Sequence, residues 1–191
     1  MIDESIIASM LTPSGGSIAG KVIAITGGGS GLGRATSLLL AQREAKVVVV
    51  DINDAAAAET VSAAQAAGGK ALAVTANVAL PEQVQGAIDQ TVATFGRLDV
   101  MINNAAILRS MPFLDVTPEI WKLIMSVNVD GVFYGTQFAA KQMIAQAKER
   151  KPGELIGRII NVTSLGALRN SELTAVYGTS KAAVTRISKG A

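Results

Sequence analysis

The 191-residue sequence contains no cysteine and no histidine. The lack of cysteine excludes disulfide bonds, thiolate metal sites and a cysteine nucleophile. The lack of histidine excludes an imidazole zinc site and a Ser-His-Asp triad, so we expect no metal site. Acid–base chemistry near neutral pH would therefore have to come from a lysine, a tyrosine or a carboxylate.

Charge and long apolar runs are also scarce. Charged residues make up 17% of the chain, and 17 Lys+Arg against 15 Asp+Glu leave a formal net charge of +2. The densest basic group is Lys148, Arg150 and Lys151, so no nucleic-acid partner is expected. No apolar run reaches the ~18 residues of a membrane-spanning helix, and the N-terminus does not resemble a secretory signal. These absences predict a soluble, cytoplasmic protein with no membrane partner.

What the sequence does contain is an alternation of two patterns. Hydrophobic residues make up 49% of the chain, enough at this length to bury the core of one domain. We expect a flexible lead-in over residues 1–19 and one domain over residues 20–191. Runs of successive apolar residues are typical of parallel strands covered on both faces. They predict strands at residues 21–26, 46–51, 70–75, 98–103 and 158–163.

Alanine-rich amphipathic stretches separate these strands. They predict helices at residues 31–43, 54–67, 81–95 and 118–148, the last as two helices, and a final helix from about residue 175. Asn53 or Asp54 can cap the second helix, and Thr117 can cap the fourth. Strict alternation of strand and helix implies right-handed crossovers and an α/β, doubly wound sheet.

The first predicted strand runs into a glycine-rich segment that reads Thr26-Gly27-Gly28-Gly29-Ser30-Gly31-Leu32-Gly33. Glycines let the backbone turn sharply and approach a pyrophosphate, and the following helix directs its first N–H groups at the phosphates. The spacing G-x-x-x-G-x-G fits Gly27, Gly31 and Gly33, whereas G-x-G-x-x-G does not. The alternative is an ordinary glycine-rich turn.

Asp51 ends the second predicted strand, 18 residues after Gly33. A carboxylate there can accept hydrogen bonds from the adenosine ribose of NAD and would repel the 2′-phosphate of NADP. Neither Ile52 nor Ser30 supplies a cation for that phosphate, which favours NAD. The alternative is a helix N-terminal acid, although Asp54 can already serve there.

Tyr177 and Lys181 share one face of the last predicted helix. A phenol ordinarily has a pKa near ~10, and a neighbouring ammonium group favours its ionised form. Ser164 lies just past the fifth predicted strand, where ligands gather in open α/β sheets. By itself a Tyr–Lys pair at this spacing is usually only surface decoration.

Together these motifs resemble the short-chain dehydrogenase/reductase family from about residue 21 to the end. The family pattern T-G-x-x-x-G-x-G is met by Thr26 and the three glycines. The remaining matches, in chain order, are Asn103, Asn104, Ala105 and Ala106 for N-N-A-G, then Asn128, Ser164, Tyr177 and Lys181. The resemblance implies a Rossmann-type doubly wound parallel sheet of about five strands in the order 3-2-1-4-5.

The resemblance also implies roles for individual residues. Tyr177 would exchange a proton with the substrate oxygen, which Ser164 would hold. Lys181 would favour ionisation of that tyrosine and bind the nicotinamide ribose, and Asn128 would anchor a water that relays protons. The expected cofactor-binding residues are Gly27, Ser30, Gly31, Leu32, Gly33, Asp51, Asn77, Val78, Asn104, Ala105, Tyr177 and Lys181.

Three departures from the family pattern matter. Asn77 stands where an aspartate usually bonds the adenine amino group, and its acceptor oxygen should weaken rather than abolish that contact. Ala106 stands where glycine is usual. The chain also ends without the sixth and seventh strands of the family, so it resembles a C-terminally truncated member. That ending would leave the fifth strand as a sheet edge.

Two classes of function follow. The first is an NAD-dependent oxidoreductase that interconverts an alcohol and a carbonyl in a small molecule. The second is a truncated nucleotide-binding relative with little or no turnover. An NADPH-dependent carbonyl reductase is a further alternative. Ile107, Leu108, Leu165 and Leu168 could line an apolar pocket or belong to the core, so no substrate is predicted.

The predicted helices also bear on assembly. In the family, subunits pair through the helices that correspond to the residues after Asn128 and after Tyr177. The first of these segments carries more apolar side chains than one buried face needs, which predicts a homodimer or homotetramer. The residues concerned are Val132, Phe133, Gln137, Ala140 and Ile144. The alternative is a fully buried helix in a monomer.

Overall fold

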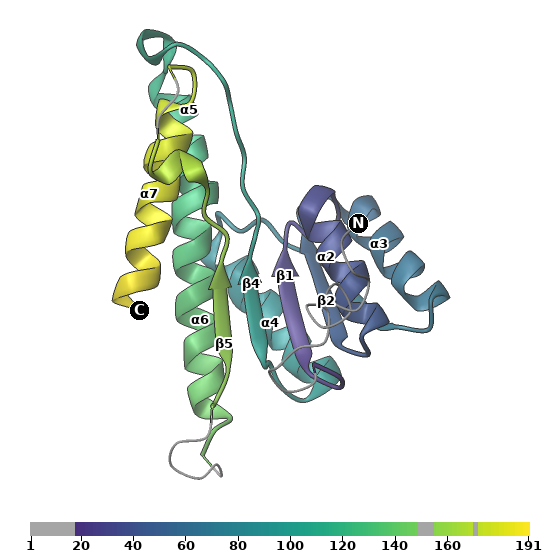
Figure 1. Cartoon of the computed structure of the whole chain (residues 1–191). Coiled ribbons are helices and arrows are strands. Elements are labelled where there is room, and N and C mark those ends of the chain that lie inside the picture. The colour runs from purple at the N-terminus through teal and green to yellow at the C-terminus, as the bar shows by residue number, and fades with distance from the viewer. Residues whose placement is uncertain (1–17, 149–154, 170–171) are drawn as a thin grey trace, which may run out of the picture.

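The structure, a computed structural model, describes residues 18–148, 155–169 and 172–191. The expected lead-in therefore lies almost wholly outside the described residues, as do Arg150 and Lys151 of the basic group. Five parallel strands form one sheet in the order β3-β2-β1-β4-β5, which confirms the predicted topology (Figure 1). Their bounds are β1 Val22–Thr26, β2 Lys46–Asp51, β3 Lys70–Thr75, β4 Val100–Asn103 and β5 Arg158–Asn161.

Helices cover both faces of the sheet. Their bounds are α2 Gly31–Gln42, α3 Asp54–Ala66, α4 Pro81–Phe95, α5 Pro118–Met125, α6 Gly131–Ala145 and α7 Ala175–Gly190. Short 3₁₀ turns, η1 Phe113–Asp115 and η3 Leu165–Ala167, follow β4 and β5. The predicted helices therefore agree with the structure to within a residue or two at their ends, apart from the fourth.

Successive side chains of a strand point to opposite faces, and the core accordingly divides in two. On one face Ile23 and Val47 pack with buried residues of α2 and α3. On the other face Ala24 and Val48 pack with buried residues of α4 and α6. Valines 47 to 50 are almost completely buried. Each contributes roughly 1.5–3 kcal/mol through burial, so this strand anchors the sheet.

Local capping agrees with the sequence at two helices. The Asn53 side chain accepts a hydrogen bond from the Ala56 N–H at 3.1 Å, at the start of α3. The Thr117 hydroxyl accepts one from the Ile120 N–H at 3.3 Å, at the start of α5. Of the two candidate caps at α3, Asn53 is therefore the one used, and Asp54 instead accepts from the Thr75 hydroxyl at 2.7 Å.

The predicted helical segment 118–148 is divided into three pieces rather than two. A π-helical turn, η2 Ser126–Asp130, joins α5 to α6. Such a turn inserts one extra residue into the helix and rotates the side chains within it, and it is common at functional sites. Here the turn carries Asn128, which is completely buried.

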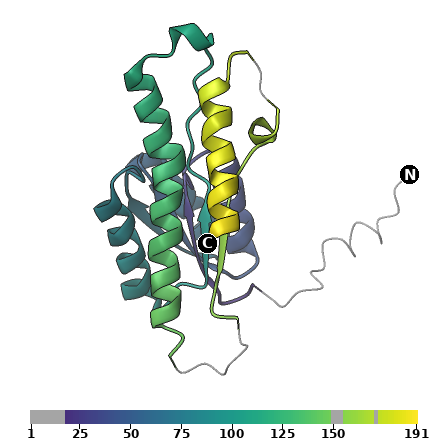
Figure 2. The same cartoon turned by 90° about the vertical axis from the view of Figure 1, so that its left-hand side faces the viewer.

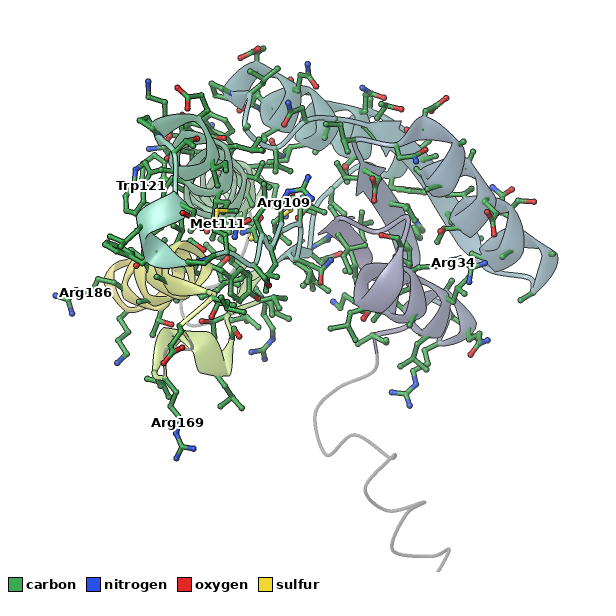
Figure 3. The ribbon with its side chains drawn as sticks, turned by 90° about the horizontal axis from the view of Figure 1, so that it is seen from above. Arg34, Arg109, Met111, Trp121, Arg169 and Arg186 are labelled. Carbon is green, nitrogen blue, oxygen red and sulfur yellow. The ribbon has the colours of Figure 1, made fainter. Side chains whose placement is uncertain are left out.

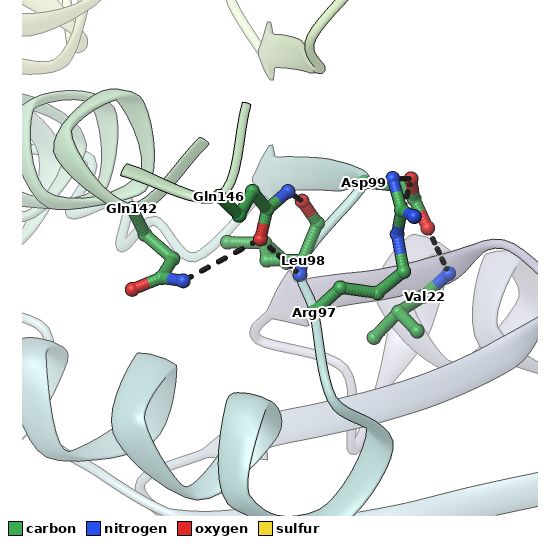
Figure 4. Close-up of polar contacts among 6 residues, drawn as sticks. All are labelled: Val22, Arg97, Leu98, Asp99, Gln142 and Gln146. Atoms are coloured by element: carbon green, nitrogen blue, oxygen red, sulfur yellow. Dashed lines mark hydrogen bonds and ion pairs between the residues drawn. The ribbon is translucent and has the colours of Figure 1, made fainter. Parts of the chain in front are cut away.

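The fourth strand begins at Val100, two residues later than predicted. The reason is that both backbone groups of Leu98 are hydrogen-bonded to the Gln146 side chain. This side chain accepts from the Leu98 N–H at 3.1 Å and donates to the Leu98 carbonyl. Next to it, the Asp99 carboxylate accepts from the Val22 N–H at 2.9 Å and pairs with Arg97 (Figure 4). These contacts join the start of β4 to α6 on one side and to β1 on the other.

The fifth strand ends at Asn161, two residues earlier than predicted. Beyond it, the Val162 carbonyl accepts a hydrogen bond from the Lys181 ammonium at 2.8 Å. The Thr163 hydroxyl donates to the Lys181 carbonyl at 3.1 Å. Helix α7, which lies alongside α6, is thereby fixed to the end of β5 (Figure 2). Within the described residues, no helix is long and apolar enough to cross a membrane.

Candidate functional site: a dinucleotide cleft beside a tyrosine–lysine pair

The predicted site residues gather where the parallel strands end. The glycine-rich turn follows β1, Asp51 ends β2, Asn77 follows β3, and Asn104 follows β4. Ser164 follows β5. Carboxyl ends of parallel strands share one edge of a sheet, and in open α/β sheets this edge is where ligands bind. Figure 3 shows this edge from above.

The glycine turn has the backbone that only glycine adopts readily. Gly27 and Gly31 have φ angles of +63° and +50°. A side chain at Gly33 would overlap the Gly27 carbonyl oxygen, so the first turn of α2 lies directly against the glycine turn. Ser30 precedes α2 and makes no side-chain capping bond. The N–H groups at the start of α2 are therefore available to an anion.

Asn104 braces this turn from the neighbouring strand. Its amide Nδ2 donates to the Thr26 carbonyl at 2.9 Å and to the Gly27 carbonyl at 3.3 Å. In return, the Thr26 hydroxyl accepts from the N–H groups of Asn104 and Ala105, both at 3.0 Å. Two of the expected cofactor-binding residues thus act on the shape of the turn, because their polar groups bond to its backbone.

Asp51 is also bonded to the turn. One carboxylate oxygen accepts from the Gly29 N–H at 2.9 Å, and the other accepts from the Asn53 N–H at 3.0 Å. A Cβ on Gly29 would lie 2.9 Å from the first of these oxygens. The carboxylate is therefore held at the rim of the cleft, half-buried, with lone pairs left to accept further hydrogen bonds.

Asn77 and Val78 follow β3 on the adjacent side. The Asn77 side-chain oxygen accepts from the Ala79 N–H at 3.0 Å, so part of its acceptor capacity is used within the chain. Val78 is buried, and a Cβ on Gly131 of α6 would lie 2.8 Å from its side chain. Close packing on Gly131 thus positions the loop after β3 against the start of α6.

A cavity of about 450 Å³ joins several of these residues. Gly27, Ser30, Asp51, Asn77, Val78 and Ala105 all line it, as do Ile107 and Arg109. Gly33 leaves no room for a Cβ, Ser30 has a free hydroxyl, and Asp51 retains acceptors. These features fit the phosphates and ribose of an adenine dinucleotide, which needs close backbone approach and a carboxylate.

The tyrosine and lysine lie together on α7. The Lys181 ammonium is 5.9 Å from the centroid of the Tyr177 ring. Lys181 is buried, and this burial lowers its pKa because the charged form loses water. Since an ammonium has three N–H donors and one is used by the Val162 carbonyl, two remain for other partners.

Ser164 comes close to this pair through the 3₁₀ turn η3. Its hydroxyl accepts from the Gly166 N–H at 3.1 Å. A Cβ on Gly166 would lie 3.4 Å from that hydroxyl and 3.6 Å from the Tyr177 ring. Ser164 and Tyr177 therefore both lie next to Gly166.

The Asn128 side chain connects the π-helical turn to the loop after β4 and to helix α7. Its side chain accepts from the Ile107 N–H at 2.8 Å and donates to the Ile107 carbonyl at 2.9 Å. It also donates to the Ser180 hydroxyl at 3.0 Å, and that hydroxyl donates to the Tyr177 carbonyl at 2.7 Å. The side chain of Asn128 thus positions the loop after β4 relative to helix α7, which carries Tyr177.

The structure brings together most, but not all, of the residues that the sequence singled out. Leu32 is 77% exposed at the start of α2 and does not line the cavity. Leu108, Leu165 and Leu168 are exposed, so the core interpretation is wrong for them. Sequence reasoning missed Ser180 and Arg109. Ser180 could have been noticed because it stands directly before Lys181. Arg109 could not, because no local signal in the sequence distinguishes it from any surface arginine.

Comparison with known proteins identifies the family to which the chain belongs. The family model for short chain dehydrogenases matches residues 21–191. The chain is 38% identical over 172 residues to cyclohexanol dehydrogenase of Acinetobacter sp. (strain SE19), covering 90% of this chain and 65% of that protein. It is also 38% identical over 170 residues to a 3-oxoacyl-(acyl-carrier-protein) reductase of Synechocystis sp., covering 88% of this chain and 66% of that protein.

A solved structure shows the same architecture. The crystal structure of a short-chain dehydrogenase/reductase from Burkholderia phymatum in complex with NAD matches with a TM-score of 0.85 at 30% identity. The match covers 92% of this chain and 60% of that one. The chain therefore belongs to the short-chain dehydrogenase family. It spans about 65% of the length of the cyclohexanol dehydrogenase.

Proposed function

We propose that this chain carries the cofactor-binding and proton-transferring parts of an NAD-dependent oxidoreductase that interconverts an alcohol and a carbonyl. The observation that carries the proposal is the Tyr177–Lys181 pair beside Ser164, at the same sheet edge as the glycine turn and Asp51. The two named relatives support the class of reaction, since one is an alcohol dehydrogenase and the other a carbonyl reductase.

In this proposal the nicotinamide, when bound, accepts or returns the hydride. Tyr177 takes the proton from the alcohol oxygen, and in the reverse direction it returns the proton to the carbonyl oxygen. The Ser164 hydroxyl donates a hydrogen bond to the same oxygen. The Lys181 ammonium favours the ionised tyrosine and donates to the nicotinamide ribose. Asn128 orders the proton path through the contacts that it makes with Ile107 and Ser180.

The cofactor half of the proposal places the phosphates at the glycine turn and α2, through Gly27, Gly31 and Gly33. Asp51 would hold the adenosine ribose, and Asn77 and Val78 would hold the adenine. NAD is preferred because the Asp51 carboxylate at the rim repels a 2′-phosphate. Cytoplasmic location and homo-oligomeric assembly remain predictions of the sequence.

The test of catalysis is a single tyrosine substitution. Tyr177→Phe removes the phenol oxygen, so alcohol-dependent NADH formation should fall at least ~100-fold. NAD affinity by calorimetry should change less than about threefold. Tyr134→Phe is the matched control, because Tyr134 lies on α6 against Phe138 and should leave the rate unchanged. Comparable rates in the parent and Tyr177→Phe would refute the catalytic role.

The same measurement separates the alternatives. NAD binding without turnover for a panel of secondary alcohols and their ketones would favour a nucleotide-binding protein. Preferential turnover with NADPH would favour a carbonyl reductase.

The test of cofactor choice is Asp51→Asn. The amide oxygen can still accept from the Gly29 N–H, but the negative charge is removed, so the ratio of NADP to NAD affinity should rise about tenfold. Asp54→Asn is the control, because this neighbouring carboxylate does not line the cavity. Equal NAD and NADP affinities in the parent protein would contradict the assignment.

A further inference from the structure

The cavity beside the glycine turn contains a cation that the motifs do not include. Arg109 lies in the loop between β4 and η1, 58 residues after Asp51 in the sequence. Of the described residues that line this cavity, Asp51 and Arg109 are the charged ones. Figure 3 shows Arg109 between the α5 and α2 sides of the molecule, whereas Arg169 and Arg186 extend away from it.

The Arg109 guanidinium has no protein partner in the part of the chain that the structure describes, since no hydrogen bond or ion pair involves it. The side chain is exposed at the cavity. Asp51, in contrast, is already bonded to two backbone N–H groups. The positive charge of Arg109 is therefore available to a ligand and is not needed to neutralise Asp51.

The chemistry of the proposed ligand supplies a matching anion. A dinucleotide carries two negative charges on its pyrophosphate, and the 2′-phosphate of NADP adds more. A guanidinium group binds a phosphate with two parallel hydrogen bonds, which gives direction as well as charge attraction. The glycine turn supplies N–H donors from one segment of the chain, and Arg109 supplies a full charge from another.

Resting on the proposed function, we propose that Arg109 binds a phosphate group of the dinucleotide and so contributes to cofactor specificity. If the phosphate belongs to the pyrophosphate, Arg109 strengthens the binding of NAD and of NADP equally. If it is the 2′-phosphate, Arg109 offsets part of the repulsion by Asp51 and allows NADP to bind as well.

The experiment compares Arg109→Gln with the parent protein by calorimetry, using adenosine, ADP-ribose and 2′-phospho-ADP-ribose as probes. A pyrophosphate contact predicts about tenfold weaker binding of both phosphorylated probes and unchanged binding of adenosine. A 2′-phosphate contact predicts the loss for 2′-phospho-ADP-ribose alone. Either result supports the proposal. Arg109→Lys should restore part of the affinity, because it keeps the charge but not the planar fork.

Arg186→Gln is the matched control, because it removes the same charge from the outward side of α7. The affinity of the parent should also fall more steeply with salt than that of Arg109→Gln, which a merely structural residue would not produce. Unchanged affinity for both phosphorylated probes, or an equal loss for adenosine, would overturn the proposal while leaving the proposed function intact. A parent protein that binds no ADP-ribose would overturn both.

Discussion

At the scale of single residues, the site uses side chains that also hold the backbone in place. Asp51 lines the cavity and also bonds to the glycine turn. The Asn128 side chain bonds both to the loop after β4 and to helix α7. Because each polar group has several donors or acceptors, one residue can fix the geometry and still bind a ligand. Substitutions at these positions therefore change binding and stability together.

The burial of Lys181 makes the stability of the protein depend on pH. Its pKa is lowered by burial, so the unfolded chain holds this proton to higher pH than the folded chain does. Stability therefore rises with pH in the window between the lowered pKa and the usual lysine pKa. Below that window, the buried charge destabilises the fold.

Lys181→Met should remove this pH dependence. Relative to the variant, the parent protein should gain free energy of unfolding as the pH rises from the lowered pKa of Lys181 toward the usual lysine pKa of about 10.5. Urea unfolding at several pH values measures the difference. Lys189→Met, at an exposed position on the same helix, controls for the change in net charge. Parallel pH profiles for the parent and Lys181→Met would contradict this account.

At the scale of elements, contacts between distant segments set where strands begin and end. The Gln146 amide at the end of α6 bonds to both backbone groups of Leu98. The Asp99 carboxylate bonds to the first N–H of β1, 77 residues away in the sequence. These bonds, drawn in Figure 4, align β4 with β1. They thereby align the loop of Asn104 with the glycine turn.

Asp99→Ala tests this alignment. The substitution leaves the buried Val22 N–H without its partner and should lower the free energy of unfolding by about 1–3 kcal/mol. Glu59→Ala breaks the exposed ion pair with Arg34 and should cost less than about 1 kcal/mol. Urea unfolding of both variants measures the contrast. Similar losses would mean that the Asp99–Val22 bond contributes little.

At the scale of the whole molecule, the strands of the sheet differ in how much of their surface is covered. β1 and β2 lie inside the sheet, whereas β5 ends it and leaves Ile160 47% exposed. Helix α6 also exposes Phe133 and Ile144, to 47% and 62%, while Val132 lies in the core. Apolar side chains that gather on a surface are typical of contact with another chain. The apolar residues of α6 thus divide into a core face and an outer face.

These exposed residues predict self-association. Light scattering at micromolar concentration should give at least the mass of a dimer, and the double substitution of Phe133 and Ile144 by serine should lower it. Leu39→Ser is the control, because Leu39 is as exposed as Phe133 but lies on α2, in the other layer. A monomer mass for the parent protein would remove the prediction.

The sequence by itself determined the order of strands and helices, the glycine turn and the positions of Asp51, Tyr177 and Lys181. These features depend on local periodicity, on backbone freedom at glycine and on short spacings, all of which are readable along the chain. Strand ends, the π-helical turn and the place of Arg109 were decided by the tertiary structure. The physical reason is that they depend on contacts between segments far apart in sequence, such as Leu98 with Gln146 and Asn128 with Ser180. No local pattern encodes which of many glutamines, serines or arginines will meet a given partner once the sheet has formed.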